Sequence, residues 1–345
     1  MLKMKRNYFV ISLVVLSLLI LAGCGGGQES TGQKDTDQPK KEDTYTLKFA
    51  ASWAKGDNAQ FKSLEIFKDV VEKETNGRLE IQIVGGAEVF PPTETAEAVK
   101  NGAVDGAYTS AAYYSGMIPE GHALSVTTMT NKEKVASGAT DLLREIHAKH
   151  NLYFLMTQDE TQYQPFAFVL TKPIEKLEDM KGKRLRAAPG LYGEVIKAVG
   201  ATPVTMPMSD LFSALEQGLV DGYCTVAISG GKEGYFKYAQ NMVRPGWYRG
   251  ASGIIINLDS WNKLPKDLQE QLNDITEKIN DEWLEFEKAE LDKNLQFLKE
   301  AGGQENVLSS AEADKLTNLV NDIGWKYVKE HSPEYGDKLE KVLSK

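Results

Sequence analysis

The sequence predicts an α/β protein of two related lobes, joined by hinge strands and braced by a long helix. Residues 101–109 (NGAVDGAYT) return 116 residues later as residues 217–225 (QGLVDGYCT). Each copy follows a polar residue, Thr93 or Ser209, that stands nine residues before a glycine. This order predicts an N-cap, a helix of about two and a half turns, a C-terminal glycine and a strand. Two lobes of this kind suggest a cleft between them.

Composition limits the classes of partner. The chain has 345 residues, 41% of them hydrophobic and 26% charged, which is enough to build buried cores in two domains of ordinary size. The formal net charge of −9 makes nucleic acid and anionic lipid surfaces poor partners. An anionic ligand would therefore need a locally placed cation.

The N-terminal residues predict export. Three basic residues precede an apolar run of 14 residues that ends at Leu21, and this run is short for a membrane span. The ending Leu-Ala-Gly-Cys resembles a bacterial lipobox, in which cleavage precedes Cys24 and its sulfur carries a diacylglycerol. We expect a signal peptide over residues 1–23, lipidation of Cys24, and a flexible linker over residues 24–44. A plain secretory peptide is the alternative.

Two β-α-β-α-β units follow along the chain. The expected strands are residues 45–52, 79–84, 103–109, 183–188, 203–206 and 219–225, with helices over 57–75 and 191–199 and after Thr93 and Ser209. Because strands alternate with helices, parallel sheets with right-handed crossovers are expected. We predict lobe I over residues 45–160 plus about 252–290, lobe II over 161–251, and C-terminal helices over 291–345.

The segments between and after these units predict the connections. Strand-like residues 153–156 and 166–170 bracket a polar stretch, where we expect the first crossing between lobes. Residues 253–257 fit the return crossing. Apolar residues at helical spacing run from Pro265 to Leu298, which predicts one helix of more than thirty residues that braces both lobes.

Ligands of open parallel sheets bind beyond the carboxyl ends of the strands. This rule selects Arg186, which ends a strand directly before a helix and is placed to bind a carboxylate with its guanidinium. A salt bridge to a neighbouring acid is the alternative, and Arg184 is a weaker candidate. Aromatic residues gather in the same loops: Trp53, Tyr108, Tyr113, Tyr114, Tyr163, Tyr192, Trp247 and Tyr248. Aromatic walls with a few polar groups suit a small organic ligand.

Catalytic patterns are scarce. His147 and His150 have the spacing of neighbours on a helix, but without a third ligand they are expected to be solvated surface residues rather than a zinc site. Cys224 is expected to be a small buried residue. Asp105 and Asp221 occupy equivalent places in the repeat, which favours strand-end hydrogen bonding over acid–base chemistry.

Several segments together resemble the solute-binding proteins of tripartite ATP-independent periplasmic (TRAP) transporters. They are residues 85–92 (GGAEVFPP), 104–106 (VDG), 177–186 (LEDMKGKRLR), 198–204 (AVGATPV) and 209–222 (SDLFSALEQGLVDG), followed by the helix after Pro265. The resemblance covers about residues 47–298. It implies a periplasmic-binding-protein-like fold that closes on an organic acid and delivers it to a membrane permease.

The resemblance also assigns roles to residues. The family's carboxylate-binding arginine maps onto Arg186. A second arginine or glutamine is expected near residues 162–165, where this chain has glutamines and no arginine. A subgroup that binds 2-oxo acids through a metal carries an acidic residue and a tryptophan where this chain has Cys224 and Thr225. Residues 244–247 (RPGW) resemble that subgroup, but we expect no metal and no cofactor.

These observations predict an exported receptor with no enzyme activity, held on the outer face of the cell membrane by lipidated Cys24. Its expected partners are a small carboxylate and the subunits of a membrane permease. The expected ligand-binding residues are Arg186, Trp53, Tyr108, Gln164, Thr225, Glu88, Tyr163 and Trp247. Two alternatives are the binding protein of an ATP-driven importer and a secreted two-domain hydrolase with its active site between the domains.

Overall fold

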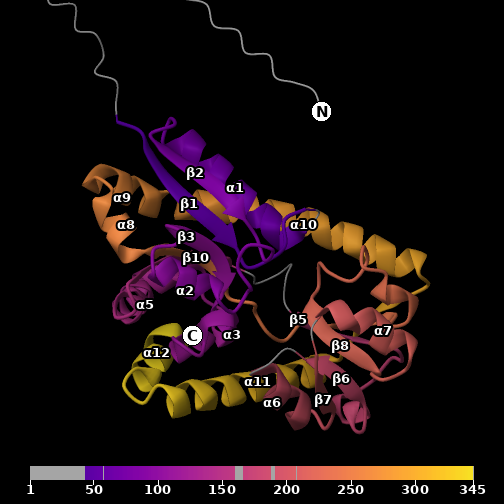
Figure 1. Cartoon of the computed structure of the whole chain (residues 1–345). Helices are drawn as coiled ribbons and strands as arrows, with labels where there is room; N and C mark the ends of the chain where they lie inside the picture. The colour runs from indigo at the N-terminus through magenta and orange to yellow at the C-terminus, as the bar shows by residue number, and fades with distance from the viewer. Residues whose placement is uncertain (1–42, 57, 160–165, 188–190, 207, 345) are drawn as a thin grey trace, which may run out of the picture. The chain divides into compact units, whose positions relative to one another are not determined.

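The structure is a computed structural model, and it describes residues 43–344 except residues 57, 160–165, 188–190 and 207. Its strands form two separate sheets, one of five strands and one of six (Figure 1). Within these described residues, no helix combines the length and the apolar character that crossing a membrane requires.

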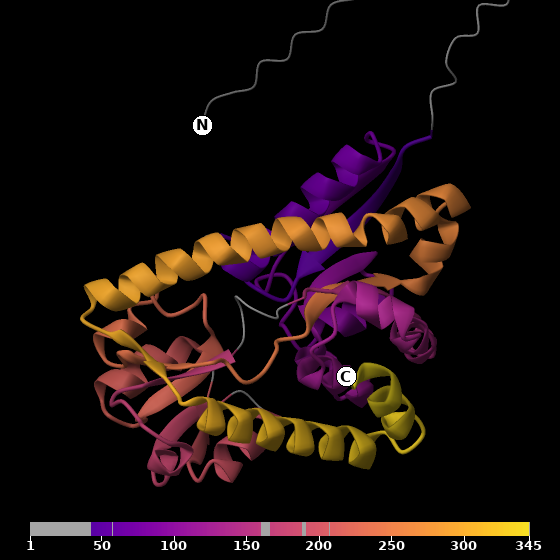
Figure 2. The ribbon, with the colours of Figure 1, turned by 180° about the vertical axis from the view of Figure 1, so that it is seen from behind.

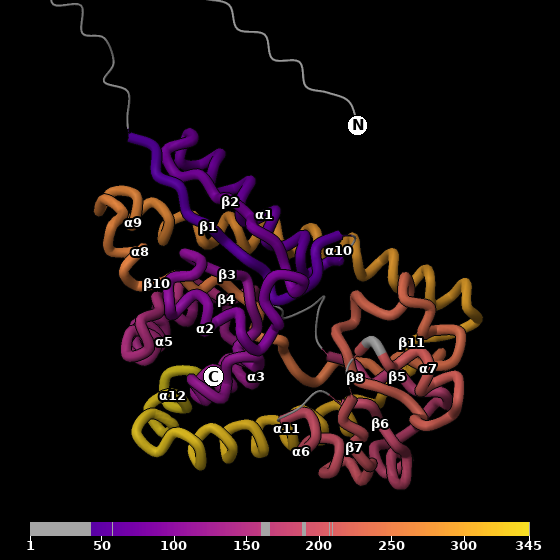
Figure 3. Tube along the Cα trace, viewed as in Figure 1, coloured from indigo at the N-terminus to yellow at the C-terminus, as the bar shows by residue number. Residues whose placement is uncertain are grey.

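The first sheet has the strand order β2-β1-β3-β10-β4 (Figure 3). Its strands are β1 (Tyr45–Ala51), β2 (Leu79–Gly85), β3 (Gly106–Ser110), β4 (Leu152–Thr157) and β10 (Ser252–Asn257). The pairs β1–β2 and β1–β3 are parallel, as predicted. The expectation of parallel pairing is wrong for β10, which runs antiparallel to β3 and β4 because the chain returns from the other sheet.

The second sheet has the strand order β11-β9-β5-β8-β6-β7. Its strands are β5 (Phe166–Leu170), β6 (Arg184–Ala187), β7 (Thr202–Thr205), β8 (Gly222–Val226), β9 (Asn241–Arg244) and β11 (Gln304–Val307). β6 is parallel to β7 and β8, whereas β5 is antiparallel to β8 and β9. The sequence did not predict β9 and β11, which are four residues each and carry polar side chains.

Strand register confirms the internal duplication. Phe49 of β1 pairs with Gly106 of β3, and Leu185 of β6 pairs with Gly222 of β8. The aspartate before each later strand bonds the first strand of its own unit. Asp105 accepts from the Lys48 amide at 2.8 Å, and the Asp221 carboxylate accepts from the Arg184 amide at 2.8 Å. The predicted strand-end role of the two aspartates is confirmed.

The helices of the repeat also match. They are α1 (Ala59–Glu74), α2 (Thr95–Lys100), α6 (Leu191–Ala198) and α7 (Leu211–Glu216). Thr93 and Ser209 were predicted to be N-caps, and this is wrong, because Glu94 and Asp210 occupy those positions. Both helices end as expected before a glycine with positive φ, +73° at Gly102 and +64° at Gly218, a conformation that glycine adopts without strain.

Shorter helices fill the connections. They are α3 (Ala123–Val126), α4 (Asn131–Ala136), α5 (Ala139–Ala148), α8 (Leu258–Lys263) and α12 (Gly336–Leu343). The 3-10 helices are η1 (Ala111–Tyr114), η2 (Pro119–His122), η3 (Leu177–Met180), η4 (Met208–Asp210) and η5 (Tyr235–Lys237).

The predicted long helix is present as α9 (Lys266–Asp274) and α10 (Thr276–Glu300), with Ile275 between them at φ −83° and ψ 1° (Figure 2). α10 contacts the cores beside both sheets. The Trp283 indole donates to the Ser63 carbonyl at 2.8 Å, and Leu298 packs among residues of the second sheet. α11 (Ser310–His331) also packs against both, through Leu316 and Val328.

His122 and His147 are both buried in the core, although His147 was expected to be a surface residue. His147 was predicted to be a solvated residue on a face shared with His150. It is fully buried, whereas α5 ends before His150. Its Nδ1 donates to the Leu143 carbonyl at 2.7 Å, and the Tyr114 hydroxyl donates to its Nε2 at 3.2 Å. Burial lowers the pKa of His147 to about 4, and burial likewise lowers the pKa of His122 to about 4.

Acid should therefore destabilise the fold. Both histidines are neutral in the folded chain and regain a pKa of 6.5 on unfolding. Their contribution is fully present above pH 6.5 and is lost as the pH falls toward about 4. We expect the unfolding temperature to fall over this range, and to fall less in His147→Gln, which cannot be protonated. Circular dichroism melts at about pH 7 and about pH 4.5 measure both. An equal fall in the two proteins would contradict the prediction.

Asn294 ties the loop after β8 to α10, and its loss should be costly. Its amide nitrogen donates to the carbonyls of Ala227 at 2.7 Å and Ser229 at 3.0 Å, and its oxygen accepts from the Gly231 amide at 2.8 Å. With a net value of about 1 kcal/mol for each bond, Asn294→Ala should lower the free energy of unfolding by about 3 kcal/mol. Urea denaturation measures this loss.

The matched control is Gln296→Ala on the same helix. Gln296 is exposed and bonds only Glu300, so its replacement should change the free energy of unfolding by less than about 0.5 kcal/mol. Equal losses in the two variants would show that Asn294 does not fix the loop.

Candidate functional site

Arg186 lies near the end of β6, and only its Nε has a hydrogen-bond partner among the residues that the structure describes. Its Nε donates to the carbonyl of Met206 at 3.1 Å. No carboxylate of the described residues forms an ion pair with it, and its side chain is half-buried. The other arginine of this strand is different. Arg184 is held by Asp221, with Nη2–Oδ1 at 3.0 Å and Nε–Oδ2 at 3.1 Å. The internal salt bridge considered for Arg186 is thus formed by Arg184.

The positive charge of Arg186 acts on three neighbours. Burial raises the pKa of the Cys224 thiol to about 12, and Arg186 opposes this rise. The pKa values of Tyr113 and Tyr235 are also raised by burial and lowered in part by Arg186. Cys224 is 1% exposed, which confirms the prediction of a small buried residue. A thiol with so high a pKa stays protonated and is neither a nucleophile nor a metal ligand at neutral pH.

Two aromatic residues of the first sheet, Trp53 and Tyr108, lie together. Trp53 follows β1 and is half-buried, with its ring centroid 5.1 Å from Tyr108 and 5.7 Å from Tyr113. Tyr108 is fully buried, and its hydroxyl donates to the side-chain oxygen of Gln158. Trp53 is therefore placed to contact a solute, whereas Tyr108 supports it from behind.

Glu88 shapes the loop after β2. Its carboxylate accepts from the amides of Gly86 at 2.8 Å and Lys55 at 3.1 Å. Hydrogen bonds from its own backbone amide and from those of Gly86 and Lys55 lower the pKa of Glu88. Gly86 lies so close to Trp53 that a Cβ atom would stand 2.0 Å from the Trp53 carbonyl oxygen. The loop is thus fixed against the segment that carries Trp53.

The remaining predicted residues lie in several places. Thr225 is 8% exposed on β8. Trp247 is 6% exposed and stacks on Phe168 at 4.8 Å, and its indole nitrogen is buried without a hydrogen bond. Tyr163, Gln164 and Cys24 fall outside the described residues.

Sequence reasoning missed Gln158 and the Met206 carbonyl. Gln158 directly follows β4, whose carboxyl end lies at the same edge as that of β3, so the strand-end rule would have found it. The sequence could not predict that Arg186 bonds the Met206 carbonyl, because every residue has a backbone carbonyl. In the described ranges, no three His, Cys, Asp or Glu side chains gather closely enough to hold a metal ion.

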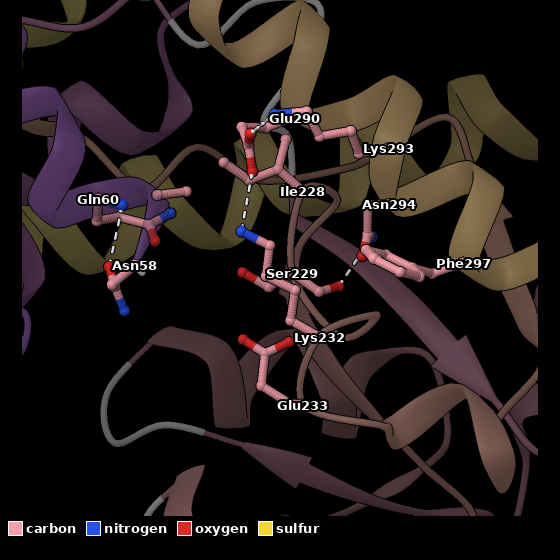
Figure 4. A pocket seen from close by; sticks show the side chains of 11 residues that line it. Asn58, Gln60, Ile228, Ser229, Lys232, Glu233, Glu290, Lys293, Asn294 and Phe297 are labelled. Atoms are coloured by element: carbon pink, nitrogen blue, oxygen red, sulfur yellow. Dashed lines mark hydrogen bonds and ion pairs between the residues drawn. The ribbon is translucent and has the colours of Figure 1, made fainter. Parts of the chain in front are cut away.

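A polar pocket lies beside α10 (Figure 4). Gln60 lines it from α1, Ser229 from the loop after β8, and Glu290 from α10, where Glu290 bonds Lys293 at 2.5 Å. Its volume of about 40 Å³ has room for about three water molecules. None of the predicted ligand-binding residues lines this pocket.

Comparison with known proteins identifies the family of this chain. A family model described as "Bacterial extracellular solute-binding protein, family 7" matches residues 49–330. The monocarboxylate 2-oxoacid-binding periplasmic protein all3028 of Nostoc sp. is 28% identical over 242 residues, which cover 68% of this chain and 65% of that protein. The match therefore spans slightly less than two thirds of the Nostoc protein. The C4-dicarboxylate-binding periplasmic protein DctP of Rhodobacter capsulatus is 25% identical over 275 residues. These residues cover 72% of this chain and 76% of that protein.

Solved structures share the fold. A TRAP periplasmic solute binding protein from Desulfovibrio salexigens with bound orotic acid has a TM-score of 0.72 at 19% identity, over 87% of this chain and 97% of that chain. Another TRAP periplasmic solute binding protein, from Pseudoalteromonas atlantica with bound sodium and pyruvate, has a TM-score of 0.68 at 22% identity. The match covers 87% of this chain and 93% of that chain. These likenesses confirm the predicted two-lobe α/β fold. Because the family model spans most of its length, the chain belongs to family 7 of the bacterial extracellular solute-binding proteins.

Proposed function

We propose that this protein captures a small organic acid outside the cytoplasm and delivers it to the permease of a TRAP transporter. The observation that carries the proposal is Arg186, a half-buried guanidinium whose bonds within the described residues go only to a backbone carbonyl. A guanidinium offers two parallel donors to a carboxylate, and this geometry is the strongest that proteins use for such a group. Trp53 supplies an apolar wall beside it.

The ligand that fits best is a monocarboxylate. Relatives are named for 2-oxoacid monocarboxylates and for C4-dicarboxylates, and one solved structure holds pyruvate with sodium. Here Cys224 and Thr225 stand where the metal-binding subgroup would carry an acidic residue and a tryptophan. Because neither Cys224 nor Thr225 offers a carboxylate, the proposal includes no cation in that place.

The proposal includes two lobes that close on the ligand. Lobe I comprises residues 45–160 plus about 252–290, lobe II comprises residues 161–251, and residues 291–345 add C-terminal helices. Arg186 belongs to lobe II and Trp53 to lobe I. A ligand that touches both lobes binds the closed state more tightly than the open state, and so shifts the population toward closure.

Replacing Arg186 tests the site. Arg186→Ala should raise the dissociation constant by at least about 30-fold, or about 2 kcal/mol, because it removes the charge that faces the carboxylate. Arg184→Ala is the matched control on the same strand. It should bind like the wild type, because Arg184 is exposed and paired with Asp221.

Isothermal titration with pyruvate, benzoate and succinate measures this difference, after mass spectrometry of any co-purified acid has extended the set of ligands. Unchanged affinity in Arg186→Ala, with the wild type binding at least one acid, would refute the assignment of Arg186. A wild type that binds no organic acid would refute the proposed function itself.

A lipid anchor at Cys24 is a further part of the proposal. It is supported by the Leu-Ala-Gly-Cys ending of the export signal and by the glycines and polar residues that follow. Cys24→Ser should release the exported protein from the membrane fraction into the soluble fraction, because no other residue would carry the diacylglycerol. Fractionation and immunoblotting measure this. Membrane retention of the variant at the wild-type level would show that Cys24 is not the anchor.

A further inference from the structure

The proposed site has one firm partner for a carboxylate, and the structure offers a second. Family resemblance places a second anchor, an arginine or a glutamine, near residues 162–165, where this chain has Gln162 and Gln164 and no arginine. The first sheet, however, continues at its ligand-binding edge into η1, which follows β3 directly. Tyr113 lies on this short helix.

Contacts on both sides of η1 fix its place between the return segment before β10 and the hydrophobic core of the second sheet. The Ser110 hydroxyl donates to the Gly250 carbonyl at 2.5 Å, and the Ala111 amide donates to the Ala251 carbonyl at 3.2 Å. Ala112 packs against the hydrophobic cluster that includes Leu185 of β6. Residues 110–112 thus bring Tyr113 to the junction between the two sheets.

Tyr113 and Arg186 both have side-chain hydrogen-bond donors without a partner among the described residues. Toward the residues that the structure describes, the Tyr113 hydroxyl forms no hydrogen bond and the Arg186 side chain donates only through its Nε. Both side chains are half-buried, so their free donors remain open to a solute. The ring of Trp53, 5.7 Å away, holds the tyrosine in place.

Electrostatics agrees with the proximity of the two groups. Burial raises the pKa of Tyr113, and the charge of Arg186 opposes the rise. The hydroxyl therefore lies in the field of the guanidinium and stays protonated at neutral pH, which is the form that donates a hydrogen bond.

We propose that the Tyr113 hydroxyl donates a hydrogen bond to the same carboxylate that Arg186 binds. The inference rests on the proposed function. A carboxylate has about four lone pairs, so one carboxylate accepts the guanidinium fork and a hydroxyl together. One cation and one neutral donor balance a single negative charge, which favours a monocarboxylate over a dicarboxylate. Because Tyr113 follows β3 of the first sheet and Arg186 lies on the second, the ligand joins the two.

Tyr113→Phe tests this, because it removes the hydroxyl and keeps the ring against Trp53. The probe is whichever of pyruvate, benzoate and succinate binds the purified wild type most tightly in isothermal titration. We expect Tyr113→Phe to weaken binding about tenfold, or about 1.4 kcal/mol. Tyr238→Phe is the control, because the hydroxyl of Tyr238 bonds Glu216 on the surface, and it should leave affinity unchanged.

A double-mutant cycle separates a shared carboxylate from a merely structural effect. If Tyr113 and Arg186 hold one group, Tyr113→Phe should cost at least about threefold less in an Arg186→Lys background than in the wild type. The unfolding temperature of the unliganded Tyr113→Phe should equal that of the wild type. Wild-type affinity in Tyr113→Phe, or additive losses in the cycle, would overturn the inference while leaving the assignment of Arg186 intact. Failure of Arg186→Ala to weaken binding would refute the assignment of Arg186 and the inference with it, whereas a wild type that binds no organic acid would refute the proposed function.

Discussion

The proposed site depends on one constraint, a guanidinium at Arg186 that forms no ion pair with any carboxylate of the described residues. Arg184 and Arg186 stand two residues apart on β6, but only Arg184 is neutralised, by Asp221 at 3.0 Å. Arg186 keeps one bond to the carbonyl of Met206. A partly desolvated charge that lacks a partner costs free energy, so the protein is most stable when an anion arrives. The net charge of −9 would repel anions at long range, which makes this local exception to the overall charge necessary.

The duplication shows how this asymmetry arose on a symmetric frame. By strand register, Ala50 of β1 occupies the position that Arg186 occupies on β6, since they pair with Ala107 and Tyr223 at equivalent places of β3 and β8. The two units share the same backbone arrangement. Each has an aspartate directly before its third strand, β3 or β8, and a glycine with positive φ after its second helix, α2 or α7. The difference lies at the carboxyl ends of the strands, where side chains do not contribute to the sheet. One unit supplies the charge and the other supplies the aromatic surface.

The sequence predicted the elements whose signal is local and strong. The repeat, the long helix and most strands follow from periodicity, glycines and strand-end residues, and the position of Arg186 follows from the strand-end rule. Features set by tertiary contacts were not predictable. β9 and β11 are four-residue segments without a clear alternating pattern, and they become strands by tertiary pairing, β9 with β5 and β11 with β9. His147 looked like a surface residue, because nothing local shows that Tyr114 covers it. The true N-caps lie one residue after Thr93 and Ser209, within the usual uncertainty of helix boundaries.

The connections between the sheets limit how the protein can close. The amide of Gln158 donates to the Ser252 carbonyl at 2.8 Å, so the outgoing and returning segments are bonded where they leave the first sheet. Buried Asp159 accepts from the Asn131 amide at 2.9 Å, which fixes the start of the outgoing segment further. The returning segment is bonded further, because the carbonyls of Gly250 and Ala251 accept from the Ser110 hydroxyl at 2.5 Å and the Ala111 amide at 3.2 Å. α10 has no glycine or proline at which to bend, and it contacts both sheets. In the proposed closure, the side-chain contacts of α10 with one sheet would shift while those with the other stay in place, which is the small sliding of packed helices seen in shear motions.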